Sequence, residues 1–108
     1  MSHELPNCKI TVLKRLFNQD LAEEYLDVED EFVACEQFKD GQEFIVEPAF
    51  QMPEGFCPWA WADIRGDIMT VFAGGNPPWI KQRGTVITGC TDWFRPVIFK
   101  VERIERGN

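Results

Sequence analysis

The stretch CPWAWADIRGDIMTVFAGG, from Cys57 to Gly75, decides the predicted fold. Pro58 suits the first position of a helix, where its missing N–H is not needed. Apolar side chains then recur at helical spacing and form one stripe, made of Trp61, Ile64, Ile68, Val71 and Phe72. The pair Gly74-Gly75 is typical of a helix end. The stretch therefore predicts the principal helix of the protein, over about 58–73, with Cys57 as its N-cap.

The segments on either side of this helix have the patterns of strands. Cys8–Phe17 alternates apolar and polar residues, and Glu43–Glu47 follows a tight turn at Asp40-Gly41. Near the C-terminus, Gly84–Cys90 and Pro96–Glu105 predict an antiparallel hairpin. We therefore expect a mainly antiparallel sheet of about four strands, with the principal helix packed on it.

A short N-terminal helix over about 19–26 is also expected, because Asn18 is a typical N-cap residue and acidic residues follow it. The acidic run Asp27–Glu31 is interpreted as a solvated loop, since it lacks the spacing of oxygen ligands that a calcium loop needs. Phe32–Phe38 fits either a turn of helix or a strand. The whole chain, 1–108, is predicted to be a single α+β domain with a loose N-terminus over 1–7.

Charge and composition disfavour several classes of function. The hydrophobic content of 44% is enough for a core without metal or disulfide staples. A formal charge of −7 repels phosphates and anionic lipid headgroups, so we expect no nucleic-acid partner and no membrane partner. No apolar run is long enough to span a bilayer, and the first residues, MSHELPNCKI, lack the pattern of a secretory signal. A cytoplasmic location is therefore expected.

In that compartment the four cysteines, Cys8, Cys35, Cys57 and Cys90, should be mostly reduced. They form no C-x-x-C pair, so the zinc-ribbon and thioredoxin patterns are absent. The chain has one histidine, His3, in a segment expected to be loose. Because histidine is the commonest general base near neutral pH, an enzyme built on a Ser-His-Asp or Cys-His arrangement is disfavoured.

Five segments together resemble a family of small uncharacterised prokaryotic proteins: ITVLKRLFNQDLAEEYL, FKDGQEFIV, MPEGFCPWAWADI, GGNPPWIK and GCTDWFRPVIFKVERI. The resemblance runs from about Lys9 to Glu105. It implies a free-standing module of anaerobe-type metabolism and transfers no established activity. The residues that match its two signature segments are Cys57, Trp59, Trp61, Asp63, Cys90, Asp92, Arg95 and Pro96, and a cysteine is also common in the family at the position of Cys35.

Cys57 is the first candidate for chemistry, because a helix N-terminus favours negative charge and so a reactive thiolate. If Cys35 and Cys90 converge on Cys57, three thiolates would form a soft metal site, for zinc, copper(I) or an iron–sulfur species. The alternatives are that these cysteines are small apolar fillers or that two of them form a disulfide. Trp61 is expected in the core. Trp59 either packs under the NPPW loop (Asn76–Trp79), which we favour, or lines a cleft.

The remaining candidates are charged residues. Asp63 and Asp92 could carry protons in catalysis, although Asp92 could equally hold a turn through its own backbone. Arg95 could pair with Asp92 or bind an anionic group of a ligand.

Three functions therefore compete. The favoured one is a small-molecule or metal-binding module that uses Cys57, Cys90 and Cys35, with Trp59 and Arg95 as ligand contacts. The second is an enzyme with Cys57 as nucleophile or redox centre and Asp63 or Asp92 as proton carrier. The third is an interaction module that docks through exposed aromatic residues. An edge strand of the sheet could also pair two copies in a homodimer.

Overall fold

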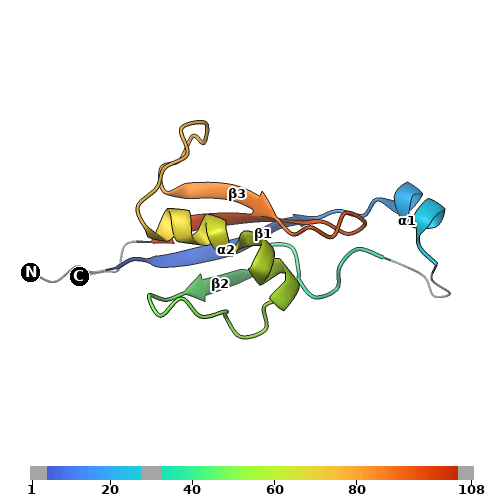
Figure 1. The fold of residues 1–108 in the computed structure, drawn as a ribbon, viewed down its shortest axis with the longest axis horizontal. Helices are drawn as coiled ribbons and strands as arrows, with labels where there is room; N and C mark the ends of the chain where they lie inside the picture. Colours follow the sequence, from blue (N-terminus) through green and yellow to red (C-terminus); the bar gives the residue numbers. More distant parts are fainter. Residues whose placement is uncertain (1–4, 28–32, 105–108) are drawn as a thin grey trace, which may run out of the picture.

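The computed structural model describes residues 5–27 and 33–104. Within these residues the elements follow the order β1 (Asn7–Arg15), α1 (Gln19–Tyr25), β2 (Glu43–Val46), α2 (Pro58–Phe72), β3 (Thr85–Gly89) and β4 (Val97–Ile104). The strands form one antiparallel sheet in the order β2-β1-β4-β3, and α2 lies over one face of it (Figure 1). The predicted α+β class, with a mainly antiparallel sheet and one principal helix, is confirmed.

The two central strands supply the middle of the core. Alternate side chains of β1 and β4 point toward α2 and are fully buried: Cys8, Ile10, Val12, Val97, Phe99 and Val101. The register explains this, because Ile10 lies opposite Val101 and Val12 opposite Phe99, so that apolar partners meet on one face. The other face is more polar, and there Lys9 forms ion pairs with Glu43 and Glu102.

Helix α2 follows the predicted stripe. Ala60, Ile64, Ile68 and Val71 are buried against the sheet, and Trp61 packs half-buried at the edge of the core. Cys57 is the N-cap residue and Pro58 the first helical residue, as predicted. The helix ends one residue early, with Ala73 as its C-cap. Among the described helices, none combines the length and the apolar character needed to cross a bilayer.

An aromatic cluster fixes the irregular segment before β2. Phe38 is buried and makes edge-on contacts with Phe44, Phe56 and Phe99, at centroid separations of 5.0 to 5.9 Å. Residues 33–38 form neither the helix nor the strand that were considered for Phe32–Phe38. The cluster holds this segment beside the core through the ring of Phe38.

Both bounds of β1 differ from the expectation. β1 begins at Asn7, inside the segment 1–7 that was expected to be loose, because Asn7 pairs with Ile104 of β4. The strand ends at Arg15 instead of Phe17. Residues 1–4 of the predicted loose terminus, with His3, lie outside the described residues, as do residues 28–31 of the acidic run.

Candidate functional site

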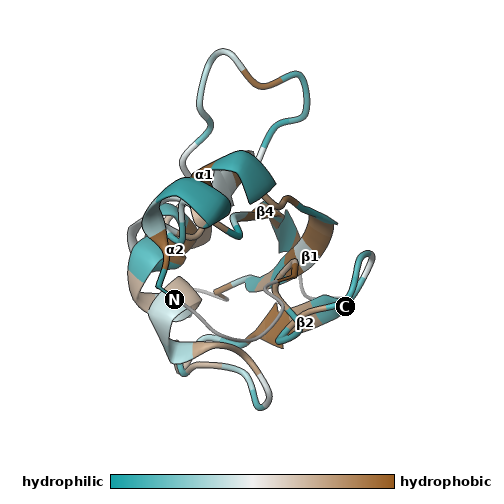
Figure 2. Cartoon of the chain, turned by 90° about the vertical axis from the view of Figure 1, so that its right-hand side faces the viewer, coloured by the Kyte–Doolittle hydropathy of each residue, from teal (hydrophilic) through white to brown (hydrophobic). Residues whose placement is uncertain are grey.

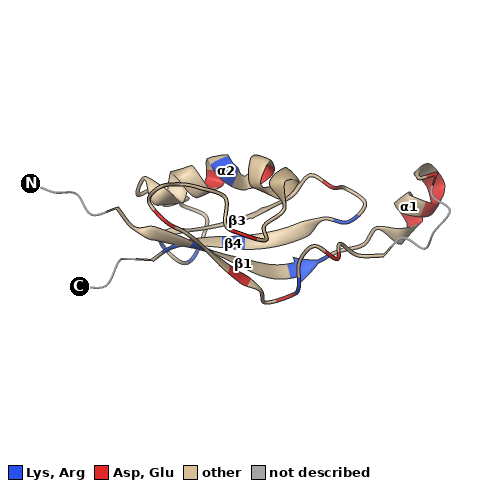
Figure 3. Ribbon diagram, turned by 90° about the horizontal axis from the view of Figure 1, so that it is seen from below, with Lys and Arg blue, Asp and Glu red and all other residues tan. Residues whose placement is uncertain are grey.

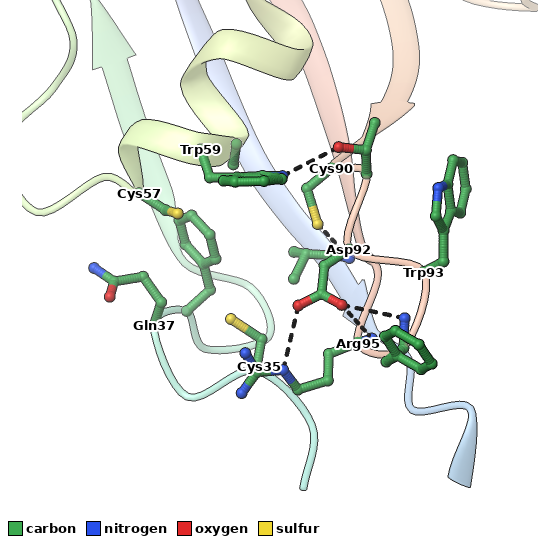
Figure 4. Close-up of a pocket in the computed structure, with 13 residues that line it drawn as sticks. Cys35, Gln37, Cys57, Trp59, Cys90, Asp92, Trp93 and Arg95 are labelled. Carbon is green, nitrogen blue, oxygen red and sulfur yellow. Dashed lines mark hydrogen bonds and ion pairs between the residues drawn. The ribbon is translucent and has the colours of Figure 1, made fainter. Parts of the chain in front are cut away.

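A cavity of about 520 Å³ lies where α2 begins, β3 ends and β4 begins. Three segments that are distant in the sequence line it: residues 35–38, the first turn of α2 with Cys57, and the loop between β3 and β4. Figure 4 shows the side chains of these segments around it. The residues that matter for its chemistry are Cys35, Cys57, Trp59, Cys90, Asp92 and Arg95.

Trp59 is held over the cavity by a chain of hydrogen bonds. Its indole Nε1 donates to the Oγ1 of Thr91 at 3.1 Å. That hydroxyl lies 3.0 Å from both carboxylate oxygens of Asp63 and donates to them, while the backbone N–H of Thr91 donates to Asp63 Oδ2 at 2.7 Å. Asp63 therefore fastens the β3–β4 loop to α2. The same hydrogen bonds hold the Trp59 ring in place, although the exposed fraction of Trp59 is 66%.

Asp92 holds the turn that shapes the other wall. Its Oδ1 accepts hydrogen bonds from the backbone N–H groups of Phe94 and Arg95, both at 3.1 Å. Its Oδ2 pairs with the Nε of Arg95 at 3.3 Å. Both side chains of this pair are about one-third exposed (34% and 31%). The turn therefore presents a partly desolvated carboxylate–guanidinium pair at the cavity.

The sulfur atoms of Cys35, Cys57 and Cys90 come from three different segments, and Figure 4 shows them on different sides of the cavity. Cys90 is the most firmly held, since its Sγ accepts a hydrogen bond from the backbone N–H of Val97 at 3.3 Å. Cys57 makes no side-chain capping bond at the start of α2. All three are half-buried and none forms a disulfide.

The described residues give no support to the predicted three-thiolate metal site. In residues 5–27 and 33–104, no group of three or more His, Cys, Asp or Glu side chains is arranged to hold a metal ion. Cys35, Cys57 and Cys90 all line the cavity, each from a different segment of the chain.

Most of the predicted site residues line the cavity, and one of them acts on it through another residue. Asp63 does not line the cavity and acts on it through Thr91. The favoured position of Trp59, under the NPPW loop, is wrong, because Trp59 lines the cleft and bonds to Thr91. Trp59 and Trp61 point to different sides of α2, and Trp61 is the one that packs on Phe50 and Phe56. The sequence analysis did not predict Thr91 or Gln37 as site residues. For Thr91 the one signal in the sequence was its place beside Asp92, which was a candidate.

The fourth cysteine lies apart from the site. Cys8 is fully buried in β1. Burial raises the pKa of its thiol from 9.0 to about 11, an effect that the nearby charge of Arg103 partly opposes. Cys8 is therefore a core residue, as the filler interpretation predicts for a buried cysteine.

Comparison with known proteins identified no relative of this chain. No protein-family model, no curated protein and no solved structure matches this chain. Membership of the small prokaryotic family that the sequence resembles therefore stays a prediction.

Proposed function

We propose that the protein is a small-molecule-binding module, and that its site is the cavity between Trp59, the three half-buried thiols and the Asp92–Arg95 pair. The observation that carries this proposal is the convergence of three distant segments on one cavity of about 520 Å³. That volume lies within the range of about 300 to 1,000 Å³ that is typical of small-ligand sites.

The lining indicates the kind of ligand. Trp59, Trp93 and Phe94 offer apolar surface, so a flat, mainly apolar molecule would bury most of its area there. A polar group of the ligand would face the Asp92–Arg95 pair. A guanidinium has five N–H donors and can serve Asp92 and a ligand oxygen together. The favoured ligand is therefore an aromatic molecule with one acidic group.

The hydrogen bonds favour binding over catalysis at Cys57. A nucleophilic thiol needs a base beside it. The two carboxylates that could serve, Asp63 and Asp92, use their oxygens to hold Thr91 and the turn before Arg95. Carboxylates that hold the wall of a pocket in this way are expected in a preformed binding site.

A fluorescence titration with anilinonaphthalene sulfonate tests the proposal, since this probe is aromatic, apolar and anionic. The native protein should bind one equivalent with a blue-shifted emission. Cys57→Phe should lower the affinity by about tenfold or more, because the ring fills the cavity. Cys57 makes no capping bond, so its replacement removes none. Arg95→Gln should weaken binding and Arg95→Lys should weaken it less.

Met69→Phe is the matched control, because Met69 is on the same helix, is 43% exposed and does not line the cavity. It should bind the probe like the native protein. Thermal unfolding of each variant shows whether it is folded. If folded Cys57→Phe and Met69→Phe bind the probe equally well, the cavity is not the site.

A further inference from the structure

Helix α1 is fastened to the rest of the described fold at its start, where the backbone N–H and the Nδ2 of Asn18 donate to the carbonyl groups of Phe94 and Trp93. It has seven residues, whereas isolated helices of fewer than about 12 residues are marginal in water. It packs on neither α2 nor any strand and projects from one end of the molecule (Figure 1). Leu21 and Tyr25, four residues apart on one face, are exposed by 40% and 71%. An apolar face of this kind is stabilised when another surface covers it.

The surface around this face is acidic. The segment 16–27 contains Asp20, Glu23, Glu24 and Asp27 and no lysine or arginine. Figure 3 shows acidic residues in red on α1. A surface that covers Leu21 and Tyr25 must therefore combine apolar side chains with positive charge.

The loop between α2 and β3 offers that combination. We name residues 76–84 the Trp79 loop. Trp79 is 78% exposed, and the exposed side chains of Lys81 and Arg83 follow it. Residues 76–84 contain no Asp or Glu, although the chain as a whole carries −7. Tryptophan and arginine are the residues that most often dominate binding energy at interfaces.

The fold holds the Trp79 loop in a closed form. The Oδ1 of Asn76 accepts the backbone N–H of Gly84 at 2.6 Å and the Nη2 of Arg103 at 3.1 Å, so both ends of the loop are tied together. Gly84 has a φ of +69°, and a Cβ there would meet the Arg103 guanidinium at 3.0 Å. Figure 2 shows the loop standing clear of the sheet and helix. Trp79 is therefore presented on a fixed base.

We propose that α1 of one copy docks on the Trp79 loop of a second copy. Leu21 and Tyr25 would pack against Trp79. Asp20 and Glu24, four residues apart on the flank of the same face, would face Lys81 and Arg83. Within one chain α1 and the loop lie at opposite ends (Figure 1), so they can meet only between copies.

The contact joins two different surfaces, so it is head-to-tail and leaves a free α1 at one end of each assembly. A helix of seven residues and a short loop bury less area than the roughly 1,200 Å² of a stable interface. The association should therefore be weak, dependent on concentration and sensitive to salt.

Sedimentation velocity of the full chain tests this, from about 10 μM to about 1 mM protein. At about 50 mM NaCl the mean sedimentation coefficient should rise with concentration without a plateau at the dimer, and at about 500 mM NaCl it should fall toward the monomer value. Lys81→Glu with Arg83→Glu should remove the rise, and Asp20→Lys with Glu24→Lys should remove it as well. In each of these proteins the Trp79 loop and the flank of α1 beside Leu21 and Tyr25 carry the same sign of charge, since Glu23 lies on the opposite face of α1.

An equimolar mixture of the two charge-reversed proteins should associate again, since every surface then finds one of opposite sign. Lys14→Glu with Lys39→Glu, a reversal of the same size at exposed positions on neither surface, should leave the association unchanged. The proposal is overturned if the native chain stays monomeric at low salt. It is also overturned if association survives both reversals, which would indicate pairing through an edge strand, or if the mixture stays monomeric.

Discussion

The indole N–H of Trp59 donates to the hydroxyl of Thr91, 3.1 Å away, and joins the first turn of α2 to the loop that closes the cavity. Thr91→Val keeps the shape of the side chain and removes this hydroxyl. We expect a loss of about 1 kcal/mol in the free energy of unfolding, measured by urea denaturation, because the side-chain bonds to Trp59 and Asp63 are lost. Affinity for anilinonaphthalene sulfonate should fall several-fold.

Thr91→Ser is the matched control, because it keeps the hydroxyl and should keep the probe affinity close to the native value. Equal affinities in folded Thr91→Val and Thr91→Ser would show that this hydrogen bond does not position the wall of the site.

The buried thiol of Cys8 predicts a loss of stability at high pH. Its pKa is about 11 in the folded chain and 9.0 when exposed, so unfolding releases a proton between these values. The free energy of unfolding should therefore fall as the pH rises from about 9 to 11, by about 2 to 3 kcal/mol from this group. Well below pH 9 the thiol is protonated in both states and contributes no slope.

Urea denaturation of the native chain and of Cys8→Ala at several pH values between 8 and 11 checks this prediction. Cys8→Ala should be less stable at pH 8, because it leaves a small space in the core, and its stability should fall less steeply with pH. Parallel curves for the two proteins would mean that Cys8 does not titrate as described.

Burial also separates the four thiols by reactivity. Cys35, Cys57 and Cys90 are half-buried around the cavity, whereas Cys8 is fully buried. A disulfide reagent that counts thiols should therefore react with three groups in the folded chain and with the fourth only in denaturant. Saturating anilinonaphthalene sulfonate should slow the three reactions. If the probe binds and does not slow them, it occupies another part of the molecule.

Phe38 anchors one wall of the cavity to the core through its contacts with Phe44, Phe56 and Phe99. Phe38→Ala should cost about 3 to 5 kcal/mol in the free energy of unfolding, since it removes a large buried ring. Phe38→Leu, which keeps most of the volume, should cost clearly less. Equal and small losses in both variants would contradict the role given to this ring.

The sequence predicted the elements well where one periodicity dominated. The stripe of α2 and the alternation of β1 and β4 each bury one face, so local pattern and tertiary packing agree. The segment 33–38 could not be predicted, because the single ring of Phe38 fixes it and no period marks it.

The sequence predicted most of the residues that line the site, but it predicted the roles of these residues less well. The segments with Cys57 and Cys90 stood out by their composition, and the structure brings them to one cavity. The bond from Trp59 to Thr91 could not be foreseen, because it joins residues 32 positions apart whose proximity depends on the packing of α2 on β3. For the same reason the spacing of the cysteines could not show that three of them line one cavity.

The central claim is that a ligand occupies the cavity beside Trp59. A proton–nitrogen correlation NMR spectrum resolves the indole N–H signals of the four tryptophans, which single Trp→Phe variants assign. Titration with anilinonaphthalene sulfonate should shift the Trp59 signal progressively to saturation and leave the Trp79 signal in place. A Trp59 signal that stays unchanged while the probe binds, or a shift confined to Trp79, would contradict the account.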